Sequence, residues 1–142
     1  MKAITLWQPW ASLIADGRKT IETRSRPWSF IGPIAIHASK YADPVAMSHF
    51  YPHGGRILPL GAVVAVAIKI NCVKLPSMYA TPDEYGDFTF GRYGYVLANT
   101  HKLSTPSPVS GKQGIWEWSI DPSLADELLM WGGEVLSGKD DV

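Results

Sequence analysis

The sequence is poor in cysteine, because Cys72 is the single one among 142 residues. A lone cysteine excludes an intramolecular disulfide, and with it the small secreted scaffolds that depend on several disulfides. This composition fits a reducing compartment, and we expect a cytoplasmic location. The start of the chain agrees, since Pro9 interrupts the apolar stretch that follows Lys2 too early for a secretory signal peptide.

Net charge and long apolar runs are lacking as well. Lys and Arg number 13, and so do Asp and Glu, which gives a formal charge of zero. A neutral chain argues against non-specific binding to long nucleic acid, which needs many cationic contacts, but it does not exclude one local basic patch. The longest apolar run, residues 61–68, is far too short to span a membrane and is typical of a buried strand. We therefore expect no membrane contact.

The residues that are present have the composition of one globular domain. Hydrophobic residues make up 46% of the chain, which is enough for a substantial core at this length. We assign residues 1–131 to a single domain and residues 132–142 to a frayed C-terminal tail.

Periodicity predicts several short elements along the chain. Helices are expected over 9–17, 43–51 and 121–131, each with a proline near its start. Strands are expected over 2–7, 19–24, 33–39, 61–75, 93–103 and 115–120. Strands and helices do not alternate regularly, which disfavours a doubly wound sheet. We expect an α+β fold: a small mixed β-barrel of five or six strands with short helices packed at its ends.

Residues 76–92 and 104–114 are predicted loops. The first is long enough to suggest a function. It is either a flap that stacks Phe90 or Tyr93 on a ligand, or a turn packed against the end of the barrel. Lys112, in the second loop, and Lys40 either extend a basic rim around a binding site or are simply solvated.

Charge is concentrated in the segment DGRKTIETRSRPW, residues 16–28. Only 18% of the chain is charged, yet this segment contains Asp16, Arg18, Lys19, Glu22, Arg24 and Arg26. An extended strand places Glu22 and Arg24 on one face, with Lys19 just before them. On an open surface, such an ion pair contributes only about 0–1 kcal/mol. Gathered in a cavity, the three groups suit a planar polar ligand or acid–base chemistry.

Tryptophans flank this charged segment. Of the six in the chain, Trp7 and Trp10 precede it and Trp28 ends it. Aromatic faces beside Lys and Arg are a common means of holding a nucleic-acid base. The alternative is packing in the core, which the apolar helical stripe favours for Trp10. For Trp7 and Trp28 both interpretations stay open.

Residues 17–24 fit the pattern G-x-K-x-x-E-x-R, which is the signature of ASCH domains, a branch of the PUA-like superfamily. Together with the flanking segments LWQPW, IAIHAS, GAVVAVA and GKQGIWEWSI, the sequence resembles the EOLA-like group of that family over most of residues 3–121. This resemblance implies a PUA-like barrel in which the signature lines a cleft between helix and barrel. It also implies that the ligand is RNA or a nucleotide-like or nucleoside-like small molecule.

The resemblance identifies candidate ligand-binding positions. The signature supplies Gly17, Lys19, Glu22 and Arg24. The flanking segments supply Gln8, Pro9, Trp10, His37 and Lys112, and Trp28 joins them as an aromatic candidate.

One branch of the resembled family is enzymatic and hydrolyses N4-acetylcytidine, with the signature lysine activating a threonine three positions later. In this chain the residue three positions after Lys19 is Glu22. An enzyme would therefore need Glu22 as general base on water, with Lys19 or Arg24 stabilising the oxyanion. Lys19 and Glu22 are the catalytic candidates in that case. Other ASCH proteins are reported as ribonucleases, which would need an acid–base pair and no metal.

The leading hypothesis is a domain that binds RNA, a single nucleotide or a modified base. The first alternative is a metal-independent amidohydrolase acting on N4-acylcytidine or a similar small amide. The second is a protein-interaction adaptor. We expect no cofactor and no metal, because the four histidines are scattered and no nearby Asp or Cys completes a zinc set.

Overall fold

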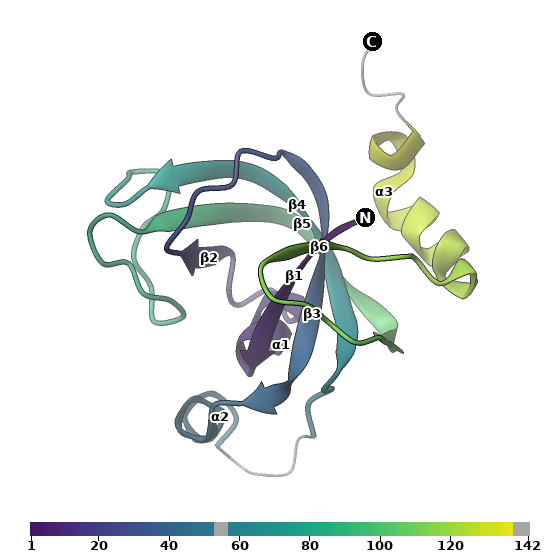
Figure 1. The fold of residues 1–142 in the computed structure, drawn as a ribbon, viewed down its shortest axis with the longest axis horizontal. Coiled ribbons are helices and arrows are strands. Elements are labelled where there is room, and N and C mark those ends of the chain that lie inside the picture. The colour runs from purple at the N-terminus through teal and green to yellow at the C-terminus, as the bar shows by residue number, and fades with distance from the viewer. Residues whose placement is uncertain (53–56, 138–142) are drawn as a thin grey trace.

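The chain folds into one mixed sheet accompanied by short helices, as its hydrophobic pattern predicts. The computed structural model describes residues 1–52 and 57–137, the last four of these by backbone alone. Its elements are shown in Figure 1: β1 (Lys2–Gln8), α1 (Trp10–Ala15), β2 (Ile21–Arg24), β3 (Gly32–Ala42), α2 (Pro44–Phe50), β4 (Ala62–Lys74), β5 (Tyr93–Pro108), β6 (Ile115–Glu117) and α3 (Ala125–Ser137), with a 3-10 turn at Pro122–Leu124.

The six strands form a single sheet in the order β2-β5-β4-β3-β1-β6. β1 pairs with β3 in parallel, and the other neighbours are antiparallel. The predicted α+β class and mixed sheet are therefore confirmed. In the described part of the chain the two outermost strands, β2 and β6, do not pair with each other, so the ladder ends where a closed barrel would continue.

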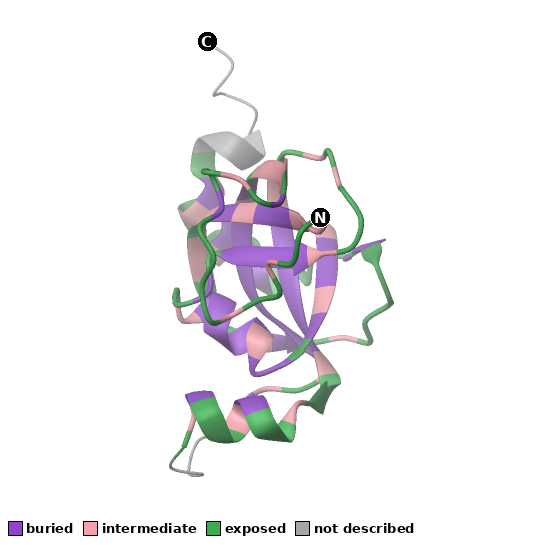
Figure 2. Cartoon of the chain, turned by 90° about the vertical axis from the view of Figure 1, so that its left-hand side faces the viewer, coloured by how far each residue is buried: buried purple, intermediate pink, exposed green. Residues whose placement is uncertain are grey.

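Helix α1 lies against this sheet and leads directly into the charged segment. Its residues from Ala11 to Ala15 are buried, and it packs on β1, β3, β4 and β5. Figure 2 shows the buried residues gathered in the strands at the centre of the molecule. After the helix, Gly17 adopts a φ of +81°, which favours glycine, and its N–H donates to the carbonyl of Ile14. The chain thus turns sharply from α1 into β2.

The helix α2 begins as the sequence predicts. Asp43 precedes it, and its carboxylate accepts from the N–H groups of Val45 and Ala46. Pro44 occupies the first turn, where its missing N–H costs nothing.

Several boundaries differ from the predicted ones, and β3 continues to Ala42 instead of ending at residue 39. β5 continues to Pro108, because its far end still pairs with β4 at Ala62. β6 is confined to residues 115–117, where it meets the first residues of β1. α3 extends to Ser137, beyond the predicted end at 131, with a break in helical geometry at Gly133. The rest of the predicted tail, 138–142, lies outside the described residues.

A cluster of buried hydrophobic side chains lies between the sheet and α3. The side chains of Trp116, Trp118, Leu124 and Leu128 are buried there. No helix in the described ranges is long and apolar enough to cross a membrane.

Candidate functional site

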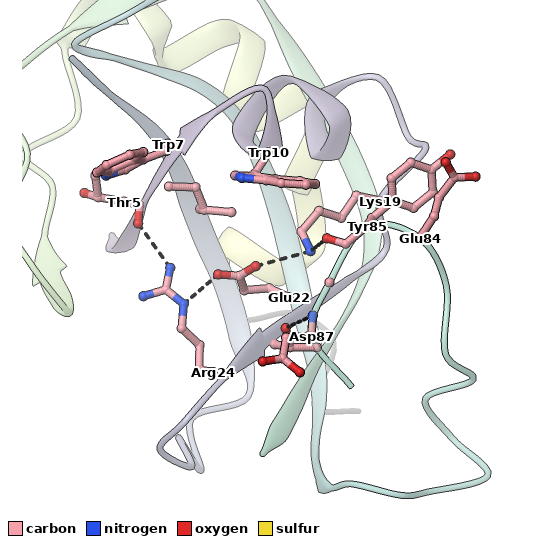
Figure 3. A pocket seen from close by; sticks show the side chains of 12 residues that line it. Thr5, Trp7, Trp10, Lys19, Glu22, Arg24, Glu84, Tyr85 and Asp87 are labelled. Carbon is pink, nitrogen blue, oxygen red and sulfur yellow. Dashed lines mark hydrogen bonds and ion pairs between the residues drawn. The ribbon is translucent and has the colours of Figure 1, made fainter. Parts of the chain in front are cut away.

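The charged segment borders a cavity of about 400 Å³, which we call the motif cavity. β1 and α1 supply one wall, β2 supplies the floor, and the loop before β5 supplies the other wall (Figure 3). The residues that line it are Thr5, Leu6, Trp7, Trp10, Lys19, Glu22, Thr23, Arg24, Glu84, Tyr85, Gly86 and Asp87.

Glu22 holds the central position among the charged groups. Its side chain lies between Lys19 and Arg24 in Figure 3. Oε1 is 3.3 Å from Nζ of Lys19, and Oε2 is 2.6 Å from Nε of Arg24. Only 7% of Glu22 is exposed, so the two cations compensate a carboxylate that is largely removed from water. Of the two arrangements that the sequence left open, an exposed ion pair and a gathered trio, the structure has the gathered trio.

The ammonium group of Lys19 is bound by other groups of the protein. Lys19 is 2% exposed, and besides pairing with Glu22 its ammonium donates to the carbonyls of Ile21 at 2.9 Å and Tyr85 at 2.7 Å. Two of the three donors of this ammonium have carbonyl acceptors, and its ion pair with Glu22 provides the third contact. Lys19 therefore ties β2 to the opposite wall and fixes the orientation of Glu22.

Arg24 keeps donors that face the cavity. Nε binds Glu22, and Nη2 donates to the backbone carbonyl of Thr5 at 3.1 Å. Nη1 has no hydrogen-bond partner among the residues that the structure describes. The guanidinium is thus held in place by two contacts and still offers N–H groups to a ligand.

The loop before β5 does line the cavity, but through residues 84–87 rather than through Phe90 or Tyr93. Phe90 is 81% exposed, and Tyr93 pairs with Arg24 in the ladder between β2 and β5. The N–H of Asp87 donates to Oγ1 of Thr23 at 3.1 Å. This bond and the one from Lys19 to Tyr85 attach the loop to β2.

Two tryptophans line the motif cavity, in different ways. Trp10 is half-buried, packs against the core, and lies with its ring centroid 6.0 Å from Nζ of Lys19. Trp7 is 53% exposed, and its ring is 5.5 Å from that of Tyr41. Trp10 thus combines the core packing that its apolar stripe predicts with a place in the lining of the motif cavity, and Trp7 offers an accessible aromatic face.

Three predicted site residues support the motif cavity from outside its lining. Gln8 is fully buried and bonds to Ser12 and to the carbonyl of Pro59. Pro9 precedes α1, and Gly17 ends the turn after it. These residues position α1 and the start of β2.

Trp28 does not line the motif cavity. It stacks on Phe30, with ring centroids 5.3 Å apart, and packs against the core. Lys69, which is fully buried in β4, donates to the carbonyls of Trp28 and Phe30 at 2.5 and 2.8 Å. Burial lowers the pKa of Lys69. Lys69 was not among the predicted site residues, although a lysine directly after the apolar run of residues 61–68 is a visible signal.

His37 and Lys112 line a second cavity of about 450 Å³, next to the motif cavity. His37 is 2% exposed, and burial lowers its pKa. Its Nε2 is 2.7 Å from the carbonyl of Val109, so Nε2 must donate, and Nδ1 then accepts from Oγ1 of Thr5 at 3.2 Å. His37 is therefore a satisfied, neutral histidine.

Thr5 also belongs to the site, although it was not among the predicted site residues. It lines both cavities. Its carbonyl accepts from Arg24, and its hydroxyl accepts from Nε1 of Trp116 at 3.0 Å and contacts His37. The only signal in the sequence is a polar residue between Ile4 and Leu6 in β1.

The arrangement suits recognition of a planar polar molecule. A fixed carboxylate and a fixed guanidinium present acceptors and donors side by side, and aromatic rings border them. In the described ranges, no three His, Cys, Asp or Glu residues are grouped so that they would hold a metal ion.

Comparisons with known proteins give consistent results. The chain is similar to the crystal structure of an ASCH protein from Zymomonas mobilis, with a TM-score of 0.57, 21% identity, and coverage of 91% of this chain and 93% of that one. Two single-residue mutants of the Zymomonas protein give TM-scores of 0.57 and 0.56, identities of 21% and 19%, and coverage of 91% of this chain in each case and of 96% and 94% of theirs. No curated protein matches the chain. The ASCH domain profile matches residues 4–84, and the chain therefore belongs to the ASCH domain family.

Proposed function

We propose that the protein binds RNA or a nucleotide-like small molecule, with one base held in the motif cavity. The observation that carries this proposal is the contact of 2.6 Å between Glu22 and Arg24 inside a cavity bordered by Trp7 and Trp10. Membership of the ASCH family is consistent with a nucleic-acid ligand.

The chemistry of the pair favours a base that has an exocyclic amine next to a ring acceptor. Oε2 of Glu22 accepts a bond from Arg24, and Oε1 forms an ion pair with Lys19, but a carboxylate has about four lone-pair sites, so it can accept from an amino group as well. Carboxylates accept in this way from N4 of cytosine. The free N–H groups of Arg24 can donate to the adjacent ring acceptors. Cytidine is therefore the first nucleoside to test.

The support for a preformed site comes from Lys19 and Thr5. Both are held by partners in the protein, and together they fix Glu22 and Arg24 before any ligand arrives. A site that is ordered in advance loses less entropy on binding. The volume of about 400 Å³ fits a single base or nucleoside rather than a duplex.

Binding is better supported than hydrolysis. A hydrolase using Lys19 would have to release this ammonium from two carbonyls and from Glu22. Release of acetate from N4-acetylcytidine would establish the hydrolase alternative. Binding of a protein partner, without any nucleoside, would establish the adaptor alternative.

Isothermal titration with cytidine, uridine and adenosine tests the proposal. We expect cytidine to bind more tightly than uridine, because uridine lacks the amine that Glu22 would accept from. Glu22→Gln should weaken cytidine binding by about tenfold or more, since hydrogen bonds to charged groups contribute roughly 1.5–3 kcal/mol.

Glu117→Gln is the matched control, because Glu117 is an exposed glutamate of β6 that pairs with Lys2 and lines neither cavity. It should leave the affinity unchanged. If no nucleoside or nucleotide binds, or if Glu22→Gln binds cytidine like the wild type, the proposal is wrong.

Two finer assignments accompany the proposal. The flanking segments LWQPW and GKQGIWEWSI support placement in the EOLA-like group of ASCH proteins. The order of the six strands and the position of α1 across four of them support a PUA-like barrel.

A further inference from the structure

The second cavity adjoins the motif cavity and shares three lining residues with it: Thr5, Trp7 and Arg24. Its remaining lining residues are His37, Ser39, Lys40, Tyr41, Gly61, Ser110, Gly111, Lys112, Gln113 and Gly114. A ligand larger than a base can therefore extend from one cavity into the other past Arg24.

The two cavities differ in charge. The motif cavity is lined by two cations and by three carboxylates, those of Glu22, Glu84 and Asp87. The second cavity is lined by three cations, Arg24, Lys40 and Lys112, and no carboxylate lines it among the residues that the structure describes. His37 adds no charge there, because burial disfavours its protonated form. The charge of the chain as a whole is zero, so this local excess of positive charge is a property of the cavity.

The two lysines of the second cavity are not neutralised by the protein. Lys40 and Lys112 form no ion pair within the part of the chain that the structure describes, whereas Lys2, Lys19 and Lys102 all do. The stem of Lys40 lies along Gly61, whose Cβ position would be 3.5 Å from Cγ of Lys40.

The loop that carries Lys112 is anchored at its base. The carbonyl of Val109 accepts from His37, and the N–H of Val109 donates to the carbonyl of Gly61 at 3.1 Å. Two residues later, Gly111 lies directly on the imidazole of His37. These contacts attach the loop after β5 to His37 of β3 and to Gly61, just before β4. Lys112 is carried by this anchored loop.

We propose that the second cavity is a phosphate subsite and that the ligand is a nucleotide or a phosphodiester strand rather than a free nucleoside. This inference rests on the proposed function: the base occupies the motif cavity, and the adjoining phosphate lies between Lys40, Lys112 and Arg24. Arg24 then binds at the junction, where its planar fork suits both a base edge and a phosphate. The exposed ring of Trp7 borders both parts of the ligand.

Isothermal titration with cytidine, 5′-CMP, ribose 5-phosphate and a short single-stranded oligocytidine tests the inference. We expect wild-type protein to bind 5′-CMP at least tenfold more tightly than cytidine. This advantage should shrink as salt is raised, because it is electrostatic. Tighter binding of the oligocytidine than of 5′-CMP would indicate a strand as the ligand, and equal binding would indicate a free nucleotide; both support the subsite.

Substitutions of the two lysines distinguish binding in the second cavity from binding in the motif cavity. The double variant Lys40→Ala/Lys112→Ala should lose most of the preference for 5′-CMP over cytidine. Lys74→Ala is the matched control, since Lys74 is an exposed lysine at the end of β4 that lines neither cavity. It should retain the full preference.

The outcomes distinguish the two proposals. Equal affinity for cytidine and 5′-CMP, or an unchanged preference in the double variant, overturns the phosphate subsite and leaves the base site intact. Binding of ribose 5-phosphate that depends on Lys40 and Lys112, without any binding of cytidine or any effect of Glu22→Gln on 5′-CMP, supports the subsite and overturns the base site. Failure of all four probes to bind overturns both.

Discussion

Gly111 lies so close to His37 that a Cβ atom at residue 111 would stand 2.4 Å from both Nδ1 and Cε1 of the imidazole. The same atom would be 2.9 Å from Oγ1 of Thr5. No side chain fits in this space, and the His37 ring is held by bonds at both nitrogens. The contact therefore requires glycine at this position of the loop.

Gly111→Ala should displace the loop from His37 and destabilise the fold by about 1–3 kcal/mol, the usual range for overpacking. Urea denaturation measures the loss, and the imidazole signals of His37 in NMR report the broken contact. Gly114→Ala is the control, because no atom lies near its Cβ position, although its φ of +70° costs about 1 kcal/mol. Unchanged His37 signals in Gly111→Ala would contradict the close contact.

Stability should depend on pH through His37. Burial lowers the pKa of this group in the folded state below its ordinary value of 6.5. The unfolded chain therefore takes up the proton more readily, and the free energy of unfolding falls as the pH drops below 6.5, until the folded-state pKa is passed. Above 6.5 this group has no such effect.

His37→Gln tests this dependence, because glutamine keeps a hydrogen-bonding side chain without a titration in this range. Urea unfolding of both proteins at about pH 7.5 and pH 5.5 brackets the titration of an unperturbed histidine. We expect the loss of stability between the two pH values to be smaller in His37→Gln. An equal loss in both proteins would assign the acid sensitivity to other groups.

Lys19→Met should destabilise the domain and loosen the loop of residues 84–87. The substitution leaves the carbonyls of Ile21 and Tyr85 without their donor and removes one cation from Glu22. Loss of such buried partners costs roughly 2–4 kcal/mol. Urea denaturation measures the stability, and faster hydrogen exchange at Tyr85 and Asp87 measures the loosening.

Lys2→Met provides the comparison for Lys19→Met. Lys2 also pairs with a glutamate, Glu117, but at an exposed position. Its loss should cost only about 0–1 kcal/mol. Equal effects of the two substitutions would show that Lys19 has no special role in joining the walls of the motif cavity.

Arg24→Lys should weaken nucleotide binding although the charge is kept. A lysine cannot contact Glu22 and the carbonyl of Thr5 while also presenting a planar fork to the ligand. We expect the affinity for 5′-CMP to fall by about tenfold or more, as for loss of a hydrogen bond to a charged group. Arg26→Lys, an exposed position two residues later, should have no effect on the titration. Wild-type affinity in Arg24→Lys would exclude Arg24 from the site.

The local pattern of the sequence predicts most of the helices and strands, and it predicts that Glu22 and Arg24 lie on the same face of β2. The alternation of Ile21, Glu22, Thr23 and Arg24 requires Glu22 and Arg24 to share a face wherever the strand lies. Asp43 and Pro44 specify the start of α2 in the same local way. Such features depend on neighbours in the chain, and the backbone period of a strand or helix is sufficient to infer them.

Local periodicity does not predict contacts between residues that lie far apart in the sequence. Lys69 and Trp28 are 41 residues apart, and their contact withdraws Trp28 from the site. His37 and Val109 are 72 apart, and Thr5 and Trp116 are 111 apart. Each of these contacts exists because pairing of distant strands brings polar groups together in the interior, where they must find partners.

Local periodicity is sufficient to infer the class of fold, the strand that carries Glu22 and Arg24, and the start of α2. Three features follow only from the folded chain: Lys19 is a buried link between two walls, residues 84–87 face the site, and Lys40 and Lys112 share a cavity with Arg24. The physical reason is that burial, and the pairing of polar groups that burial demands, depend on which distant segments meet in space.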